Sequence, residues 1–464
     1  GAAAADFDTL IDLIKATVAP DSWDDLGGAG TITPFPGGIY VDREGLMVRL
    51  DSNHTDQLQG FRREQFEGMF SENGQDVRDY SSMRKISLVR LQRQLELLQL
   101  RGELADEAMQ NLAGMYRIQY VLVYPEQGDI VIAGPAGPWQ ENRDGRVVNI
   151  NNGRPVLKLD YLVELMRNAY SDNPTFGCSI TPRAAHLLKA KQYLDAQKGK
   201  VLTPRNTEAW LAGLRDSVGV QDVEVFGTDN QTQLARILVE ADHHMKLVGL
   251  GEVPGIPGMN SYLDNLVESD EPAQAVNMLR WWFTTNYQAL HASKDGLAYE
   301  IVGPAVKVLS ENEIVDKLGD RQQTGKSDPL TQQFASEFTR NYEMLAERYP
   351  VYHELRNIFD LAVISMLIKS QNLDQRIRWN PEFYTKSYGY QIKRAPAPTT
   401  IESVISHRVT KDRVVIAAIS GGVVIDPRPV VTSENLKSDD YGILNAEYLG
   451  NRNSTLHGRT WWWD

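Results

Sequence analysis

Residues 319–327 carry the residue types of a nucleotide-binding loop, Gly-Asp-Arg-Gln-Gln-Thr-Gly-Lys-Ser. Such a loop has four residues between its two glycines, so that the backbone N–H groups converge on the phosphates. Five residues separate Gly319 from Gly325, and the preceding segment 313–318 is too charged for a buried strand. We therefore interpret this segment as a polar loop. A nucleotide bound against Gly325 and Lys326 would contradict that interpretation.

Two further patterns lack a residue that their chemistry requires. Gly249 and Gly251 begin a dinucleotide-binding fingerprint, but Pro254 occupies the place of its third glycine. Ser420 precedes two glycines, as the nucleophile of a hydrolase elbow does, but Ala418 occupies the place of the first glycine of that motif. We therefore expect no cofactor, and we predict that the two glycines after the serine form a bulge or turn between strands.

The sequence Asp242-His243-His244 has the residue types of a metal site. We expect residues 234–241 to form a strand, and successive side chains on a strand point to opposite faces, so the two histidines could not share one ion. Cys178 is the only cysteine, which excludes an internal disulfide and a cysteine-based metal site. We therefore predict no metal. Nothing marks any two of the many carboxylates as an acid–base pair, so the catalytic residues, if any, are unknown.

Tryptophans are the most unusual feature of the sequence. Trp461, Trp462 and Trp463 form a large aromatic cluster, which exposes apolar area unless something covers it. The cover could be their own domain, a neighbouring subunit, or a glycan or other ligand. We take these three residues as a candidate interface. Elsewhere, exposed aromatics that could bind a glycan or peptide are Trp139, Trp281 and Trp282.

Composition bounds the class of protein. The chain has 464 residues, of which 42% are hydrophobic, so we expect two to four folded units. The 48 basic and 61 acidic residues give a formal charge of −13, which repels a nucleic acid backbone. The basic residues between Arg84 and Arg101 are interpreted as the solvated face of a helix. No apolar run approaches the roughly 18 residues of a membrane-spanning helix, so we expect no transmembrane segment.

Hydrophobic spacing predicts a multidomain α+β protein with mostly antiparallel sheets. The predicted units are a helix-plus-strands module at 1–52, a helical pair and a β-hairpin at 53–158, an α/β module at 159–310, a helical hairpin near 328–371 with a β region within 311–435, and a tail at 436–464. Within them we expect helices over 82–112, three helices between 159 and 217, strands at 220–226, 234–241, 281–286 and 297–308, and a break at Pro350.

The sequence resembles a family of uncharacterised proteins, a domain of unknown function restricted to planctomycetes. The resemblance rests on residues 7–28 with their Pro-Asp-Ser-Trp-Asp core, 220–227, 245–249, 349–352, 355–357 and 420–423. It implies an exported protein in an extracytoplasmic setting, at the periplasm, the cell surface or outside the cell. Residues 1–5 lack the basic start and apolar stretch of an export signal, which agrees with a chain that begins after processing or after a flexible segment. The resemblance supplies no activity and no functional residues.

Three hypotheses about function remain open from the sequence. The leading one is a non-catalytic structural or self-assembling protein of the bacterial cell envelope or exterior, which forms homo-oligomers. The second is an enzyme of unassigned type, in which carboxylates and His243 or His244 converge from different modules. A hydrolase is the preferred class of enzyme. The third is a surface module that binds glycans or peptides.

Overall fold

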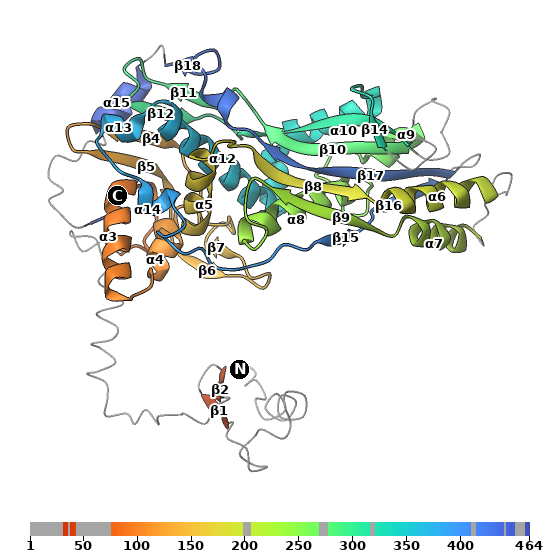
Figure 1. Ribbon diagram of the computed structural model, residues 1–464, viewed down its shortest axis with the longest axis horizontal. Helices are drawn as coiled ribbons and strands as arrows, with labels where there is room; N and C mark the ends of the chain where they lie inside the picture. The colour runs from red at the N-terminus through yellow and green to blue at the C-terminus, as the bar shows by residue number, and fades with distance from the viewer. Residues whose placement is uncertain are drawn as a thin grey trace. The chain divides into compact units, whose positions relative to one another are not determined.

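The computed structural model describes residues 31–35, 38–42, 76–197, 206–268, 277–315, 321–409, 414–439, 442–450 and 460–464 (Figure 1). The chain divides into two compact units, residues 1–67 and residues 68–464. In the first unit, strands β1 (Thr31–Phe35) and β2 (Gly38–Asp42) form an antiparallel pair. The helix predicted in the module at residues 1–52 lies outside the described residues.

The second unit contains a seven-stranded sheet in which every neighbouring pair but one is antiparallel. Its order is β18 (Lys437–Ser438), β11 (Leu290–Ala292), β12 (Ala298–Ile301), β4 (Tyr120–Tyr124), β5 (Asp129–Ala136), β3 (Ser81–Ser87) and β19 (Trp462–Trp463). The hairpin of β4 and β5 confirms the prediction for that part of the chain, and Val121 lies opposite Ile132.

A second sheet has eight strands. Its order is β14 (Arg321–Gln323), β13 (Val306–Val315), β10 (Asn277–Thr285), β17 (Val414–Ile425), β8 (Phe176–Pro182), β9 (Val220–Phe226) and β15 (Thr400–Glu402), with β16 (Ile405–Val409) also paired to β17. The pair β10 and β17 is parallel, and the others are antiparallel. A small third sheet joins β6 (Trp139–Glu141) to β7 (Val147–Asn149).

Helices cover both large sheets. They are α3 (Leu88–Arg101), α4 (Glu107–Gln110), α5 (Leu159–Ala169), α6 (Ala184–Ala196), α7 (Thr207–Val218), α8 (Gln233–Gly249), α9 (Tyr262–Glu268), α10 (Pro329–Arg340), α11 (Tyr342–Arg348), α12 (Pro350–Ser370), α13 (Leu373–Arg376), α14 (Glu382–Thr385) and α15 (Ile443–Gly450), with short 3₁₀ turns at 112–114 and 428–431. α8 packs on β8, β10 and β17, and α10 packs on β13. The structure therefore confirms a multidomain α+β protein with mostly antiparallel sheets.

α12 is the central helix of this unit. All residues from Val351 to Ile368 are buried, and Figure 1 shows the helix between the two large sheets. It packs against α5, α8 and α11. Pro350 occupies its first turn, where a proline costs nothing because the missing N–H would have had no partner. The predicted helical hairpin is confirmed. Its first arm, before Pro350, consists of α10 and α11, which are separated only by Asn341, and its second arm is α12.

Three predicted elements were wrong. Residues 234–241 belong to helix α8, because Thr232 accepts from Ala235 N–H and caps a helix whose apolar residues continue to Val248. Residues 297–308 form two strands of different sheets, because Gly303 has a φ of +72° and breaks the run. Residues 81–87 form β3 and not the start of a helix. Short apolar runs fit either period, and the caps decide.

Two predictions about individual residues were also wrong. Arg84 was interpreted as part of a solvated helical face, yet it lies on β3 and is fully buried. The glycines after Ser420 form neither the predicted bulge nor a turn, because they lie inside the continuous strand β17, where the register with β8 and β10 is uninterrupted. Gly422 pairs there with Ser179 of β8. Among the described helices, none is both long enough and apolar enough to cross a membrane.

Candidate ligand-binding cleft

The three terminal tryptophans, predicted as a candidate interface, lie inside their own unit. β19 pairs with β3, and Trp462 is opposite Ile86. Trp461, Trp462 and Trp463 are 3%, 1% and 7% exposed. Arg84 stacks on Trp462, with its guanidinium carbon 4.7 Å from the ring centroid. The chain's own core therefore covers the apolar area that motivated the prediction of an intermolecular contact.

The tryptophans considered for glycan or peptide binding are mostly unavailable. Trp139 and Trp281 are 1% and 0% exposed, so neither can serve as a surface platform for a ligand. Trp282 is half-buried, and the guanidinium carbon of Arg280 lies 4.6 Å from the centroid of one of its rings.

His243 and His244 lie on α8, where neighbouring side chains are about 100° apart. The Nδ1 atom of His244 is 2.7 Å from the hydroxyl of Tyr352, and burial lowers the pKa of His244 to about 4. The ring is therefore neutral at neutral pH. Among the residues that the structure describes, no group of three histidine, cysteine or acidic side chains is placed to hold a metal ion.

In the described part of the segment that resembles a phosphate-binding loop, residues 321–323 form strand β14 and not a loop. A carboxylate occupies the turn that follows. The N–H of Gly325 donates to Oε1 of Glu311 at 2.6 Å, and Lys326 is exposed. A phosphate would have to displace that carboxylate. Ser420 is fully buried, and its hydroxyl donates to Oε2 of Glu313 at 2.8 Å, so it is not presented to a substrate.

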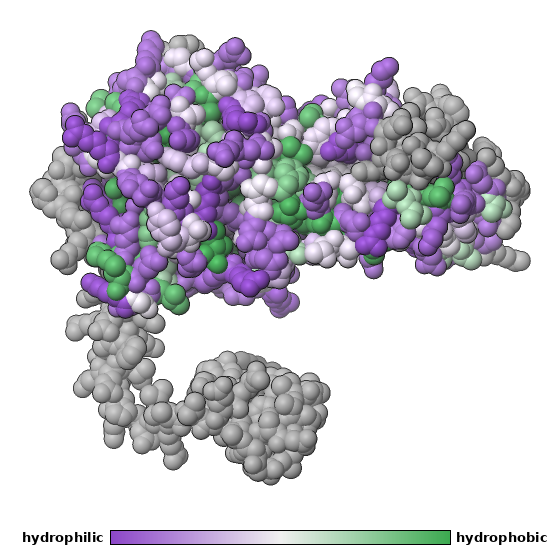
Figure 2. Space-filling view, viewed as in Figure 1, coloured by the Kyte–Doolittle hydropathy of each residue, from purple (hydrophilic) through white to green (hydrophobic). Residues whose placement is uncertain are grey.

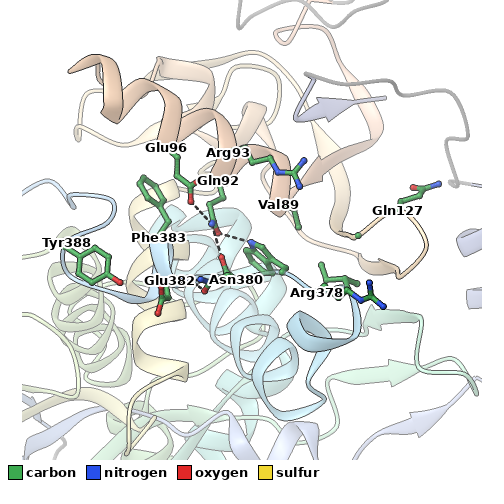
Figure 3. Close-up of a pocket in the computed structure, with 13 residues that line it drawn as sticks. Val89, Gln92, Arg93, Glu96, Gln127, Arg378, Asn380, Glu382, Phe383 and Tyr388 are labelled. Atoms are coloured by element: carbon green, nitrogen blue, oxygen red, sulfur yellow. Dashed lines mark hydrogen bonds between the residues drawn. The ribbon is translucent and has the colours of Figure 1, made fainter.

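A groove of about 480 Å³ runs between α3 and residues 377–383 (Figure 3). Its polar centre is Gln92, whose side-chain oxygen accepts from Nε1 of Trp379 at 2.9 Å. The amide nitrogen of Gln92 donates to the carbonyl of Asn380 at 2.9 Å and to Glu96 at 2.7 Å. Because these polar groups already hydrogen-bond to one another, the centre of the groove offers few free donors or acceptors to a ligand. We interpret the groove as a gap between packed elements and not as a binding site.

A second cavity, of about 290 Å³, lies at the N-terminal end of α5. We call it the lysine chamber. Chain segments far apart in sequence converge on it: the turn before β7, the N-terminus of α5, α12, and an extended segment at residues 390–397 that we call the strap. Its charged lining residues are Arg146, Lys158, Asp160, Glu354, Lys393 and Arg394.

Lys158 is the N-cap residue of α5. Its Nζ donates to the side-chain oxygen of Asn111 at 2.7 Å. Burial lowers the pKa of Lys158 to about 8, although Glu354 and Asp160 nearby favour its charged form. A lysine of this kind changes charge close to neutral pH, which is the range that ligand binding and proton transfer use.

The floor of the lysine chamber is a buried carboxylate on α12. Glu354 accepts from the hydroxyl of Tyr161 at 2.6 Å and from Nε of Arg146 at 3.0 Å. Burial raises the pKa of Glu354, against the effect of Arg146. A terminal nitrogen of the Arg146 guanidinium forms an ion pair with Glu240. The guanidinium of Arg146 is therefore already neutralised by two carboxylates of the protein.

The strap supplies two cations with different surroundings. Nζ of Lys393 donates to the side-chain oxygen of Gln110 at 2.5 Å, and Arg394 donates to that of Gln231 at 3.1 Å. The N–H of Ala395 donates to the carbonyl of Gln231 at 2.7 Å, which fixes the strap beside the start of α8. Within the described ranges, neither strap cation forms an ion pair, and the same is true of Lys158.

Sequence reasoning did not find this chamber. Lys158 and Lys393 lie in different predicted modules, and each is a lone lysine in its local sequence. The one available signal was Lys158 itself at the start of an apolar helix, a position that usually holds a small polar cap. Convergence of the other residues depends on the packing of α12 and the strap, which no local pattern encodes.

The fold and the chamber define an α+β protein with a polar cleft beside a central buried helix. Residues 178–262, from β8 to the start of α9, match a family described as a protein of unknown function (DUF1598). No curated protein and no solved structure matches the chain. The match agrees with the resemblance to an uncharacterised family.

Proposed function

We propose that this protein binds a small anionic molecule, a carboxylate or a phosphate compound, in the lysine chamber. One observation carries the proposal: Lys158, Lys393 and Arg394 surround one cavity, and each donates to a neutral side-chain amide. Lys158 is half-buried, whereas Lys393 and Arg394 are exposed. A partly buried cation in a protein is ordinarily paired with a carboxylate. An anionic ligand would add a direct ion pair to the favourable effect that Glu354 and Asp160 already have on the charged form of Lys158.

The proposal is tested by calorimetric titration with inorganic phosphate and with malonate as probes. We expect at least one of them to bind. Lys158→Gln should weaken that binding roughly tenfold to a hundredfold, because a hydrogen bond to a charged group contributes about 1.5–3 kcal/mol. Lys294→Gln, at an exposed lysine outside the chamber, is the matched control. Failure of both probes, or equal binding by the Lys158→Gln protein, would refute the proposal.

Proton linkage gives a second readout at the same site. A bound anion favours the charged form of Lys158, so it raises the pKa of that group from about 8. Affinity should therefore weaken as the pH rises through about 8, because the uncharged amine no longer attracts the anion. Titrations in two buffers of different ionisation enthalpy should show proton uptake on binding near that pH. The Lys158→Gln protein should show no such uptake.

Self-assembly into homo-oligomers, in the cell envelope or outside the cell, is a second proposal, and one observation favours it. Leu97, Leu100 and Leu104 are 47%, 84% and 88% exposed at the end of α3, and Figure 2 shows hydrophobic surface there. Clusters of exposed apolar side chains mark interaction sites. We expect oligomers in native mass spectra that Leu100→Lys dissociates and that Leu449→Lys, at a 58% exposed leucine, leaves intact. A monomeric native protein would contradict this proposal.

A further inference from the structure

A neighbouring cavity of about 350 Å³ lies further along α5 and shares Lys393 and Arg394 with the lysine chamber. We call it the glutamate chamber. It is bounded by the second half of α5, by the turn at residues 227–232 before α8, and by residues 387–394. Nearly all of its lining is polar, and both signs of charge are present: Glu164, Arg167, Asp229, Lys393 and Arg394.

Glu164 uses only one of its two carboxylate oxygens within the protein. Its side chain is on α5, and the residue is 6% exposed. Oε1 accepts from the hydroxyl of Thr228 and, at 3.0 Å, from that of Thr232. Oε2 is buried and has no hydrogen-bond partner in the described part of the chain. A buried polar atom without a partner is uncommon in folded proteins, and each case calls for an explanation.

Arg167 shows the complementary feature one turn later on the same helix. Its terminal nitrogen donates to the backbone carbonyls of Tyr390 and Lys386, so no carboxylate compensates its charge directly. Its Nε is buried and also lacks a partner among the described residues. Side chains three residues apart on a helix are neighbours. Glu164 and Arg167 therefore lie side by side in the lining of one chamber. Glu164 has an acceptor without a partner, Oε2, and Arg167 has a donor without a partner, Nε.

We propose that the glutamate chamber binds a free amino acid, with its ammonium group on Oε2 of Glu164 and its carboxylate facing Arg167. An amino acid carries an ammonium group and a carboxylate within one small molecule. These two charges complement Glu164 and Arg167, which are three residues apart on α5. Asp229 adds to the attraction for the ammonium group. A neutral polyol could hydrogen-bond here, but it would give neither Oε2 of Glu164 nor Nε of Arg167 a charged partner. This inference does not depend on an anion in the lysine chamber.

The carboxyl of Glu164 must be ionised to bind an ammonium group. Burial raises the pKa of Glu164 to about 7, with further increases from Asp229 and Asp160 and opposing hydrogen bonds from the two threonines. The charged groups that line the chamber around it are Arg167 on α5, Asp229 on the turn, and Lys393 and Arg394 on the strap. Amino acid binding should accordingly weaken as the pH falls below about 7 and Glu164 takes up a proton.

The test is calorimetric titration of the full chain with a panel of L-amino acids, followed by the N-acetyl and the carboxamide derivatives of the tightest binder. The free amino acid should bind, and either derivative should bind at least roughly tenfold more weakly, because each loses one charge-assisted contact. Glu164→Gln keeps the shape and the acceptor oxygen for the threonines, so it should fold and yet lose binding to the same degree. Asp172→Asn, at an exposed carboxylate beyond the end of α5, is the control.

Four outcomes would overturn the inference. They are no binding by any amino acid, equal binding by the N-acetyl derivative, equal binding by the carboxamide, and unchanged affinity in a folded Glu164→Gln protein. Thermal unfolding of each variant shows whether it is folded. The Lys158→Gln protein should bind the amino acid normally, and the Glu164→Gln protein should bind the anionic probe normally, so failure at one chamber can be told from failure at the other.

Discussion

A buried ion pair within helix α8 lies against the centre of the eight-stranded sheet. Nζ of Lys246 is 2.7 Å from Oδ2 of Asp242, and the two residues are 1% and 0% exposed. The contact is coulombic in character, since its geometry is not that of a hydrogen bond. The other oxygen of Asp242 accepts from the N–H of Gly422 at 2.7 Å. A side chain at Gly421 would lie 2.2 Å from the carbonyl of Trp281, so this close approach requires glycine.

Removing one partner of that pair should be costly. In Lys246→Met the buried carboxylate of Asp242 loses its compensation, and we expect the free energy of unfolding to fall by about 3–5 kcal/mol. Adding Asp242→Asn removes the remaining charge and preserves the oxygen that accepts from Gly422, so the double variant should recover part of the loss. Urea titration measures both values. A single variant as stable as Lys191→Met, at an exposed lysine of α6, would show that the pair contributes little.

Strand β19 is a structural element of its own unit. The carboxylate of Asp464 accepts from Nε and from a terminal nitrogen of Arg84 at 2.8 and 2.9 Å. The same guanidinium donates to the carbonyl of Ala113 at 2.9 Å. Because Trp462 covers one face of Arg84, the aromatic cluster, the buried cation and the edge of β3 form one assembly.

Loss of Trp462 should therefore destabilise the protein itself. We expect Trp462→Ala to lower the free energy of unfolding by about 3–5 kcal/mol, the usual cost of truncating a buried aromatic side chain. Tyr388→Ala, at a 68% exposed aromatic, should change it by less than about 0.5 kcal/mol. Urea unfolding at several protein concentrations is the measurement. A loss that disappears on dilution of both proteins would instead indicate that the tryptophans stabilise contacts between copies.

Local signals identified the elements whose ends are marked in the sequence. α10 has Asp328 as a cap and Pro329 in its first turn, and the β4–β5 hairpin has turn residues between two β-rich runs. The prediction failed where a short apolar run fits two periods, as at 234–241. The chambers could not be predicted at all, because the neighbourhood of Lys158 is created by α12 and the strap, which lie hundreds of positions away along the chain.

One hydrophobic core connects the two large sheets of the second unit. Ile132 of β5, Val423 of β17 and Leu361 of α12 belong to the same cluster of buried side chains. The sheets also interleave distant parts of the chain: β17 lies between β10 and β8. A segment of several consecutive helices and strands therefore cannot complete its sheets or its core without segments from elsewhere in the chain. The order of the strands in the sheets, and not local composition, decides which residues must fold together.

This topology predicts where the chain can be cut. Residues 68–464, one of two compact units, should fold without residues 1–67 and retain the stability of the seven-stranded and eight-stranded sheets. Residues 68–310, which end at a predicted module boundary, should not fold, because they lack β17 between β10 and β8 and they lack α12 from the common core. Circular dichroism and urea titration of the two fragments are the measurements. A cooperative unfolding transition in the shorter fragment would mean that the core is divisible, since each part would then bury enough apolar area to offset the entropy of its own ordering.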